Sequence, residues 1–284
     1  MISPQMSIAE ALATARTRFS KSATASLDAR VLLEAVTGHD RAALIARDRE
    51  HIGDHAEAYE AVVRRREAGE PAAYIVGHQE FFGLRFAVGP DVLIPRPESE
   101  MLVDAAIEAK PRRVLDLGTG SGCLLIAILD ALPDSQGAGI DASPDAIAMA
   151  FENGEKLING DRAQWFQARF DEAVALFEDE RFDVIVANPP YIAEGTALPQ
   201  SVADFEPAQA LFSGPDGLTA HHDVAHVMDA LLTIDGHAYI EIGSDQGPQA
   251  GDLYRRALGD RNVTVHQDRA GLDRMVAITP QPGL

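Results

Sequence analysis

Hydrophobic residues in the N-terminal part of the chain recur at the spacing of amphipathic helices. Such patterns cover residues 8–15, 27–36, 43–45 and 56–66, with polar residues between them. Short patterns of this kind, separated by glycine or aspartate, are typical of small helices that pack on one another. We therefore expect a helical bundle over residues 1–76, either as a scaffold or as a module that docks a partner.

The spacing of hydrophobic residues changes after the predicted bundle. Residues Gln79–Pro95 alternate between apolar and polar positions, and Gly89-Pro90 offers turn chemistry. This pattern predicts a β-hairpin, with its turn near Gly89, that links the bundle to the rest of the chain over residues 77–96.

From Glu98 onward, short apolar runs alternate with amphipathic helical patterns. This order is typical of an α/β domain, a mainly parallel sheet with helices on both faces, here over residues 97–284. The expected strand cores are Val114–Leu117, Gly137–Asp141, Gln164–Gln167, Phe182–Ala187, Ala238–Ile242, Asn262–Val265 and Met275–Thr279. The tail from 281 to 284 is expected to fray.

Composition limits the class of protein. A chain of 284 residues that is 46% hydrophobic can bury one large core and a small second one. It has no apolar run long enough for a bilayer and no signal-peptide pattern near its start, so we expect no membrane partner. Cys123 is the only cysteine, which excludes an intramolecular disulfide and fits a reducing cytoplasm.

The net charge of −20 argues against a nucleic-acid substrate, because sequence-independent binding needs a basic surface. The basic run at residues 64–66 falls on a predicted helix and is expected to be a solvated face. An acidic surface is still compatible with a protein partner that is itself basic.

A glycine-rich loop follows the first strand of the α/β region. Residues Gly118–Gly122 lie between the apolar strand and a helical run that starts at Cys123. Glycines let the backbone approach a ligand, and a helix N-terminus offers unpaired N–H groups. Asp141 ends the next strand about 20 positions on, where an acidic side chain can hold two ribose hydroxyls. A nucleoside-type cofactor is predicted, and nicotinamide remains possible from this loop alone.

The stretch Asn188-Pro-Pro-Tyr191, here called the clamp, follows the strand Phe182–Ala187. The Asn188 side-chain oxygen and the Pro189 carbonyl can accept both hydrogens of one NH2 group, and Tyr191 can cover its flat face. By itself the stretch is equally compatible with a proline-stiffened loop. Together with the glycine loop it favours methylation of a nitrogen over hydride transfer.

Two other groups of polar residues carry weaker signals. Of the histidines near 221–226, only His222 and His226 share a helix face, without the glutamate that a zinc protease places between them, so we expect no metal site. Glu241 ends a strand, and it either faces the site or orients the backbone from behind the site.

At this point the chain resembles a known family. The glycine loop, Asp141 and the clamp are similar to class I methyltransferases that use S-adenosylmethionine. Residues 69–77, 92–100 and 205–218 resemble segments of the protein glutamine methyltransferases, most closely those of peptide chain release factors. The resemblance covers about residues 5–279, and the combination is more specific than any single motif.

The resemblance implies a Rossmann-like domain with a seven-stranded sheet whose last two strands pair antiparallel. It implies S-adenosylmethionine as cofactor and, as substrate, the glutamine of the Gly-Gly-Gln loop in class I release factors, with the enzyme a monomer. Adenine is expected near Ile140, Ala142 and Phe170, but Arg169 departs from the acidic residue or tryptophan common there; it either stacks on adenine or turns to solvent. The implied catalytic residues are Asn188, Pro189, Pro190 and Tyr191, and the implied cofactor residues are Gly118, Thr119, Gly120, Ser121, Gly122, Asp141, Ala142, Arg169, Phe170 and Asn188.

Three other functions stay open. A sister enzyme would methylate a glutamine of a ribosomal protein. A DNA adenine methyltransferase could use the same clamp, but it would need base flipping and a target-reading domain, for which this short acidic chain has no evident candidate. A non-catalytic cofactor-binding protein would have no use for an intact clamp.

Overall fold

The computed structural model describes residues 1–20 and 22–281, which fall into two compact units. The first unit is Met1–His78 together with Leu198–Phe205, and the second is Gln79–Ala197 together with the chain from Glu206 on. The predicted domain limits, residues 1–76, 77–96 and 97–284, stay a prediction. In the division seen here, the predicted link falls in the second unit from Gln79 on. Most of the expected frayed tail lies outside the described residues.

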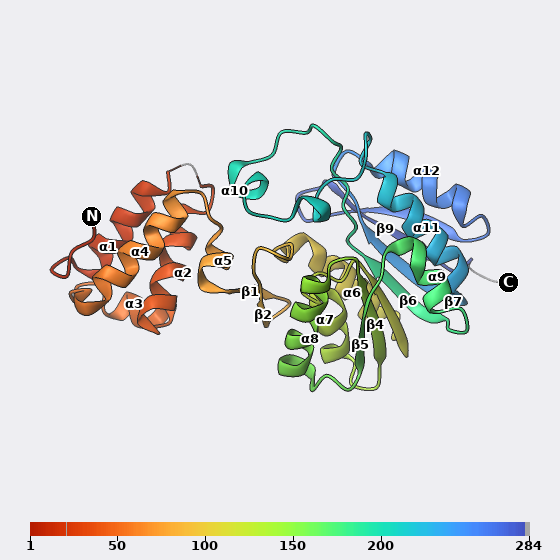
Figure 1. The fold of residues 1–284 in the computed structure, drawn as a ribbon, viewed down its shortest axis with the longest axis horizontal. Coiled ribbons are helices and arrows are strands. Elements are labelled where there is room, and N and C mark those ends of the chain that lie inside the picture. The colour runs from red at the N-terminus through yellow and green to blue at the C-terminus, as the bar shows by residue number, and fades with distance from the viewer. Residues whose placement is uncertain (21, 282–284) are drawn as a thin grey trace. The chain divides into compact units, whose positions relative to one another are not determined.

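The first unit is a helical bundle, as the N-terminal periodicity predicts (Figure 1). The Ser7 hydroxyl accepts from the Glu10 N–H, and the Glu10 carboxylate accepts from the Ser7 N–H. These two bonds satisfy backbone amide groups that have no partner within the first helix. The apolar faces enclose a separate core around Leu32, Leu33 and Tyr59. Its helices are α1 (Ile8–Arg18), α2 (Ala25–Thr37), α3 (Arg41–Ala46), α4 (Ala56–Glu67), the additional α5 (Ala72–Val76) and α10 (Gln200–Ala203).

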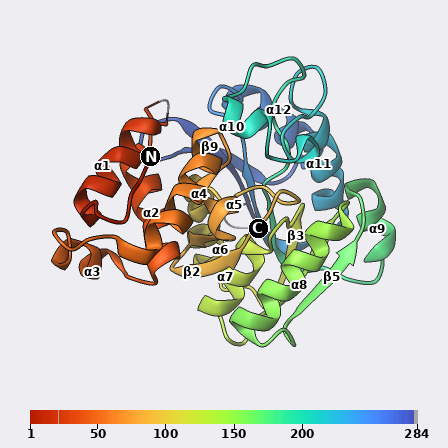
Figure 2. The same ribbon diagram turned by 60° about the vertical axis from the view of Figure 1, so that its left-hand side comes forward.

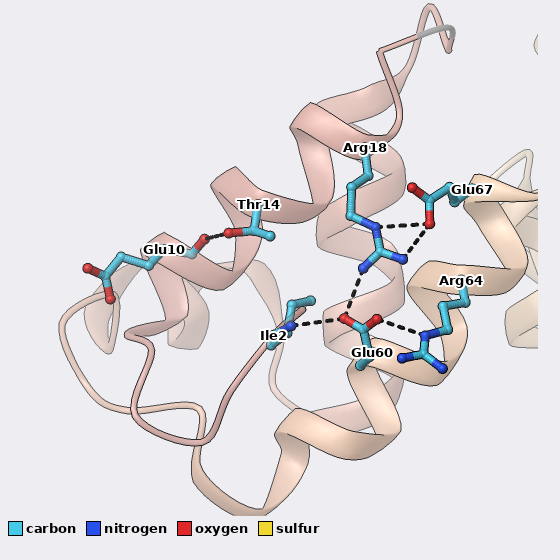
Figure 3. A network of polar contacts seen from close by, with 7 residues as sticks. All are labelled: Ile2, Glu10, Thr14, Arg18, Glu60, Arg64 and Glu67. Atoms are coloured by element: carbon cyan, nitrogen blue, oxygen red, sulfur yellow. Dashed lines mark hydrogen bonds and ion pairs between the residues drawn. The ribbon is translucent and has the colours of Figure 1, made fainter.

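Glu60 on α4 is the centre of a polar network in this bundle (Figure 3). Its carboxylate accepts hydrogen bonds from the Ile2 N–H, from Arg18 and from Arg64, each at 2.9 Å. Burial acts to raise the pKa of Glu60, but these three donors outweigh it and lower the pKa to about 2. The network ties the chain start, α1 and α4 together.

The basic run at residues 64–66 only partly behaves as a solvated face. Arg64 is exposed, whereas Arg66 forms an ion pair with Asp28 at 2.8 Å in which both side chains are nearly buried. The expectation is therefore wrong for Arg66. Helix α4 turns by about 100° per residue, so consecutive arginines cannot all face solvent.

The hairpin consists of β1 (His78–Phe81) and β2 (Leu84–Ala87). Its turn lies at Phe82-Gly83 instead of near Gly89-Pro90, which corrects the prediction. Both turn residues have positive φ, 50° and 75°, as a two-residue turn of type I′ requires. Gly89-Pro90 instead follows the second strand.

The second unit is built on one seven-stranded sheet in the order β5-β4-β3-β6-β7-β9-β8. Neighbouring strands from β5 to β7 run parallel, and β9 is antiparallel to both β7 and β8, which confirms the pairing expected for the last two strands. The strand β7 starts six residues earlier than predicted, at Leu232. The strands are β3 (Arg113–Leu117), β4 (Gln136–Asp141), β5 (Ala163–Gln167), β6 (Phe182–Ala187), β7 (Leu232–Glu241), β8 (Asn262–Gln267) and β9 (Asp273–Thr279).

Helices cover both faces of this sheet (Figures 1 and 2). Because successive strand residues point to opposite faces, Val114 and Leu115 belong to two different apolar cores. One core holds α6 (Glu100–Glu108), α7 (Cys123–Ala131) and α8 (Pro144–Ile158), and the other holds α9 (Ala173–Leu176), α11 (Thr219–Leu231) and α12 (Gly247–Ala257). This is the α/β architecture predicted from the sequence.

Strand order fixes where a ligand can lie. The central strand β3 is flanked by β4 on one side and by β6 on the other, so the chain reverses its direction of winding there. Leu117 and Ala187, the last residues of β3 and β6, pair directly. The glycine loop and the clamp therefore leave the sheet side by side, at the crevice where open α/β sheets bind ligands.

No helix in the described chain combines the length and the apolar composition that crossing a bilayer requires.

Candidate active site

A cavity of about 250 Å³ lies at the carboxyl ends of the parallel strands. Its walls come from the loops after β3, β4, β5 and β6, from residues 91–99 and from residues 207–210. Most of the predicted site residues line it, namely Gly118, Thr119, Gly120, Ser121, Asp141, Ala142, Arg169, Phe170, Asn188 and Pro190. Gly122, Pro189 and Tyr191 lie beside this lining and do not form part of it.

The glycine loop is held against β4 by its own backbone. The N–H groups of Gly118 and Thr119 both donate to the Ile140 carbonyl at 2.9 Å. Gly118 and Gly120 have φ values of 75° and 54°, a conformation that favours glycine. A Cβ added to Gly120 would meet no atom within 4 Å, so this part of the loop borders open space.

The Trp165 side chain, on β5, packs against the glycine loop and the neighbouring strand β4. Its ring lies so close to the backbone that a Cβ on Gly139 would be 2.6 Å away and one on Gly122 would be 3.1 Å away. Such distances leave no room for a side chain. Gly122 therefore serves packing at the start of α7, which explains its absence from the cavity wall.

Asn153 on α8 is a buried tether for the same loop. Its side-chain NH2 donates to the Ser121 carbonyl at 2.9 Å and to the Ala87 carbonyl at 3.1 Å, and its oxygen accepts from the Ala87 N–H at 2.8 Å. Asn153 is not among the residues predicted from the sequence, because an asparagine on a helix has no distinctive local signal.

Asp141 follows β4 and reaches the cavity with acceptor capacity to spare. One carboxylate oxygen accepts from the Gly120 N–H at 3.0 Å and the other from the Ser143 N–H at 2.9 Å. A carboxylate has about four acceptor positions, so sites remain for ligand hydroxyls. Burial raises the pKa of Asp141, and the backbone hydrogen bonds oppose that shift.

The remaining wall near Asp141 is aromatic. The Phe170 ring lies against Gly118, at 3.3 Å from the position of an added Cβ. The Arg169 side chain is 69% exposed and pairs with Asp171 at 2.9 Å. Of the two alternatives left open for Arg169, the arrangement agrees with the one in which it turns to solvent.

The clamp is attached to a buried hydrogen-bond network. Asn188 donates from its side-chain nitrogen to the Ser99 hydroxyl at 3.3 Å, and Ser99 in turn donates to the Glu241 carboxylate. The Tyr191 hydroxyl donates to the other oxygen of Glu241 at 3.3 Å, and Gln246 donates to the Tyr191 carbonyl at 2.9 Å. Glu241 therefore lies behind the clamp, where it meets two hydroxyl groups.

Burial dominates the electrostatics of this network. Ser99 and Glu241 are 2% and 1% exposed. Burial raises the pKa of the Glu241 carboxyl, against the hydrogen bonds from Ser99 and Tyr191 and the charge of Arg274. Burial, with the nearby charge of Glu241, also raises the pKa of Tyr191, so its phenol stays protonated at neutral pH.

Ser99 in the cavity wall and the buried Asp116 are two polar residues that were not predicted from the sequence. Asp116 interrupts the apolar strand β3; it accepts from the Thr119 hydroxyl at 2.6 Å, and burial raises its pKa to about 7. Ser99 lies in the segment that resembles the glutamine methyltransferases, but nothing in the sequence shows that it reaches both Asn188 and Glu241.

The histidines near residue 221 take no part in the cavity. The His221 ring is buried, with Nδ1 3.0 Å from the Tyr254 hydroxyl. Among the residues that the structure describes, no group of His, Cys, Asp or Glu side chains converges as a metal site would require.

Two family models match separate parts of the chain. Residues 10–77 match the PrmC N-terminal domain and residues 97–210 match the methyltransferase small domain. The catalytic domain of hMettl16, solved in complex with MAT2A 3′UTR hairpin 6, shares the fold, with a TM-score of 0.55 and 18% identity over 77% of this chain and 83% of that one.

Two curated relatives extend over nearly the whole chain. The release factor glutamine methyltransferase of Bordetella pertussis is 40% identical over 88% of this chain and 93% of its own length. That of Geobacter sulfurreducens is 38% identical over 89% of this chain and 88% of its own length. These matches confirm the resemblance drawn from the motifs: the chain belongs to the release factor glutamine methyltransferase family, and it is an S-adenosylmethionine-dependent methyltransferase.

Proposed function

We propose that this enzyme methylates the side-chain amide nitrogen, N5, of the glutamine in the Gly-Gly-Gln loop of class I peptide chain release factors. The observation that carries the proposal is the identity of about 40% with relatives named for this activity, over most of both chains. The placement of Asn188 in the same cavity as the glycine loop supports it.

The cavity suits the cofactor at both of its ends. Within the glycine loop, Gly120 presents backbone without side-chain bulk, and Asp141 keeps free acceptor positions for the two ribose hydroxyls. Ala142 and Phe170 supply an apolar wall for adenine, with Arg169 at its solvent edge. Bound there, S-adenosylmethionine supplies an electrophilic methyl group on a sulfonium.

The clamp would hold the nucleophile. An amide nitrogen is a weak nucleophile because its lone pair is delocalised into the carbonyl. The Asn188 side-chain oxygen and the Pro189 carbonyl would accept its two hydrogens, orient it towards the methyl group and favour the positive charge that develops on nitrogen. Pro190 would keep the loop rigid, and Tyr191 would pack against the amide and exclude water.

No titratable base is needed at the nitrogen before transfer in this scheme. S-adenosylhomocysteine leaves as the neutral thioether, and the N-methylated amide, which is strongly acidic while it carries the positive charge, then releases one N–H proton to solvent. Glu241, the carboxylate behind the clamp, is separated from the cavity by Ser99 and Tyr191. Orientation alone accounts for about 7–11 kcal/mol in well-aligned model reactions. Positioning and electrostatics would therefore carry the rate enhancement.

The N-terminal domain, residues 1–76, would recognise the protein partner, with residues 77–96 as the link to the catalytic domain. All cofactor-binding residues proposed here lie beyond residue 110, which leaves the bundle free for that role. A net charge of −20 suits a partner with a basic surface and not a nucleic acid. We further propose that the enzyme acts as a monomer in the cytoplasm, where its substrate is used in translation.

Transfer of a labelled methyl group from S-adenosylmethionine tests the function. We expect label in a class I release factor and none in the same factor with its Gly-Gly-Gln glutamine replaced by alanine. Mass spectrometry of the labelled peptide should place one methyl group on the glutamine side chain. Preferential labelling of a ribosomal protein, or of DNA, would replace this proposal with one of the other two activities.

A further inference from the structure

An asparagine side chain is nearly symmetric in shape, so packing alone cannot decide which end faces the substrate. Its oxygen accepts hydrogen bonds and its nitrogen donates them. The clamp works only if the Asn188 oxygen faces the substrate amide, because an NH2 group there would oppose the substrate's own hydrogens. Something must therefore fix the direction of the Asn188 amide.

The groups behind Asn188 have the hydrogen-bond polarity to do this. At a pH above its raised pKa, Glu241 is an ionised carboxylate that only accepts, so it draws the hydroxyl hydrogens of both Ser99 and Tyr191 towards itself. Ser99 has one hydroxyl hydrogen, and the bond to Glu241 uses it. What Ser99 can offer Asn188 is an acceptor, and the Asn188 nitrogen donates to it at 3.3 Å.

The opposite orientation of the Asn188 side-chain amide would be unfavourable. If the Asn188 oxygen faced Ser99, two acceptors would meet and the side-chain nitrogen would lose its partner. Leaving a buried acceptor without a donor is unfavourable. Ser99 and Glu241 are almost completely buried, so water cannot easily supply the missing hydrogen bond.

We propose that Ser99 and Glu241 are positioning residues that fix the polarity of the Asn188 amide, so that its oxygen faces the substrate. This inference rests on the proposed function of the clamp. Neither residue contacts the substrate in this scheme; both act through Asn188. The Ser99 hydroxyl hydrogen points to the Glu241 carboxylate, which leaves the Ser99 oxygen to accept from the Asn188 nitrogen.

Glu241→Gln is the sharpest single change, because glutamine keeps the size of glutamate. Its NH2 group can donate to Ser99, which frees the Ser99 hydrogen to bond the Asn188 oxygen and stabilises the wrong direction of the amide. Ser99→Ala removes the hydroxyl group that connects Glu241 to Asn188. We expect each variant to lower kcat for release factor methylation by about tenfold or more, with the cofactor Kd unchanged. Ser99→Thr retains a hydroxyl and should remain near the wild-type rate.

A double variant separates polarity from general disturbance of the site. In Asn188→Asp, a carboxylate oxygen replaces the nitrogen that donates to Ser99, so two acceptors meet there and this variant should be poorly active. Adding Glu241→Gln frees the Ser99 hydrogen to donate to the new carboxylate. We therefore expect Glu241→Gln to lower the rate when residue 188 is asparagine and to raise it, by about fivefold, when residue 188 is aspartate. A coupling of opposite sign is not expected from loss of packing.

Ser213→Ala serves as the matched control. Ser213 is a buried serine of the same unit that does not line the cavity, and its hydroxyl accepts from the Ala220 N–H at 2.8 Å. It should lose some thermal stability and keep its kcat. Cofactor Kd can be followed through Trp165, the only tryptophan, which packs under the glycine loop.

The outcomes separate this inference from the proposed function. A wild-type enzyme that does not methylate release factors would refute the function itself. If the wild type methylates them while Glu241→Gln or Ser99→Ala keeps kcat within about twofold, the positioning role is wrong. It is also wrong if Glu241→Gln lowers the rate of Asn188→Asp further, or if Ser99→Thr falls as far as Ser99→Ala.

Discussion

Two buried glutamates, one in each unit of the molecule, take opposite roles because their partners differ. Glu60 in the helical bundle is surrounded by the Arg18 and Arg64 guanidinium groups and the Ile2 N–H, and its pKa is lowered to about 2 (Figure 3). Glu241 behind the clamp meets two hydroxyl groups, with the charge of Arg274 at longer range, and burial raises its pKa. A carboxylate among cations ties helices together, whereas one among hydroxyls orders their hydrogens.

Asp141 adds a third environment to this comparison. Its hydrogen bonds come from backbone N–H groups, which occupy part of its acceptor capacity and leave the rest exposed to the cavity. Neither Glu60 nor Glu241 lines the cavity. The type of donor around a carboxylate therefore separates a structural ion-pair centre, a positioning group and a ligand-binding group within one chain.

The largest expected effect is on the clamp that Glu241 serves. Asn188→Ala removes one of the two acceptors for the substrate amide and should lower the chemical rate by about 10²–10³-fold, by analogy with loss of an oxyanion-hole donor. Asn188→Asp should fail nearly as badly, because it adds negative charge beside the sulfonium. Single-turnover methylation of a release factor measures both, with thermal stability as control. Turnover near wild type in Asn188→Ala would remove the clamp from the mechanism.

The ligand-binding carboxylate comes next. Asp141→Ala should weaken S-adenosylmethionine binding by about 1.5–3 kcal/mol, as expected for charge-assisted hydrogen bonds. Calorimetric titration measures the change. Asp145→Ala, the loss of an exposed carboxylate in the helix that follows, is the matched control and should bind normally. Equal affinities of the Asp141 and Asp145 variants would exclude Asp141 from the ribose site.

Glu60→Gln should affect folding and leave chemistry alone. It weakens the bonds to Arg18 and Arg64, although Arg18 keeps its bond to Glu67 at 3.1 Å. We expect a loss of about 1–2 kcal/mol in the free energy of unfolding, between the values for exposed and buried ion pairs. Urea unfolding measures the loss. A fall in kcat at a temperature where the variant is fully folded would contradict the purely structural role.

The smallest effect is the pH dependence of stability, which should have opposite signs for the two glutamates. The folded-state pKa of Glu60 is below the ordinary value of 4.5, so its contribution is complete above 4.5 and is lost as pH falls towards 2. The folded-state pKa of Glu241 is raised, so its contribution is present below 4.5 and is lost as pH rises through the folded value.

Thermal melting at several pH values tests these signs. Glu60→Gln should flatten the acid side of the profile of Tm against pH. Glu241→Gln should gain stability relative to wild type as pH rises above 4.5. Parallel profiles for wild type and both variants would mean that the partners do not set the pKa values as described.

Local pattern was enough to predict much of this protein. Helical periodicity predicted the bundle, and alternation of strands and helices predicted the parallel sheet. The glycine loop, Asp141 and the clamp each follow a strand directly in sequence, so their place at one edge of the sheet was predictable. Family resemblance added the antiparallel last pair of strands.

Other features depended on contacts between residues far apart in sequence. The hairpin turn lies at Phe82-Gly83, where the Phe82 N–H donates to the Glu100 carboxylate at 2.9 Å and Phe82 adopts a positive φ despite its side chain. Arg66 is buried because Asp28, on another helix, is there to pair with it.

The network behind the clamp shows the same division most clearly. The sequence determined that the chain contains Asn188, Ser99 and Glu241. It also determined that Glu241 ends a strand and that Asn188 follows one. Only the tertiary structure decided that they meet, because residues 89 and 142 positions apart become neighbours when β6 and β7 pair and η2 (Pro97–Ser99) packs against their ends. Hydrogen-bond polarity has no periodicity along a chain; it arises when donors and acceptors from separate strands and loops share one buried space.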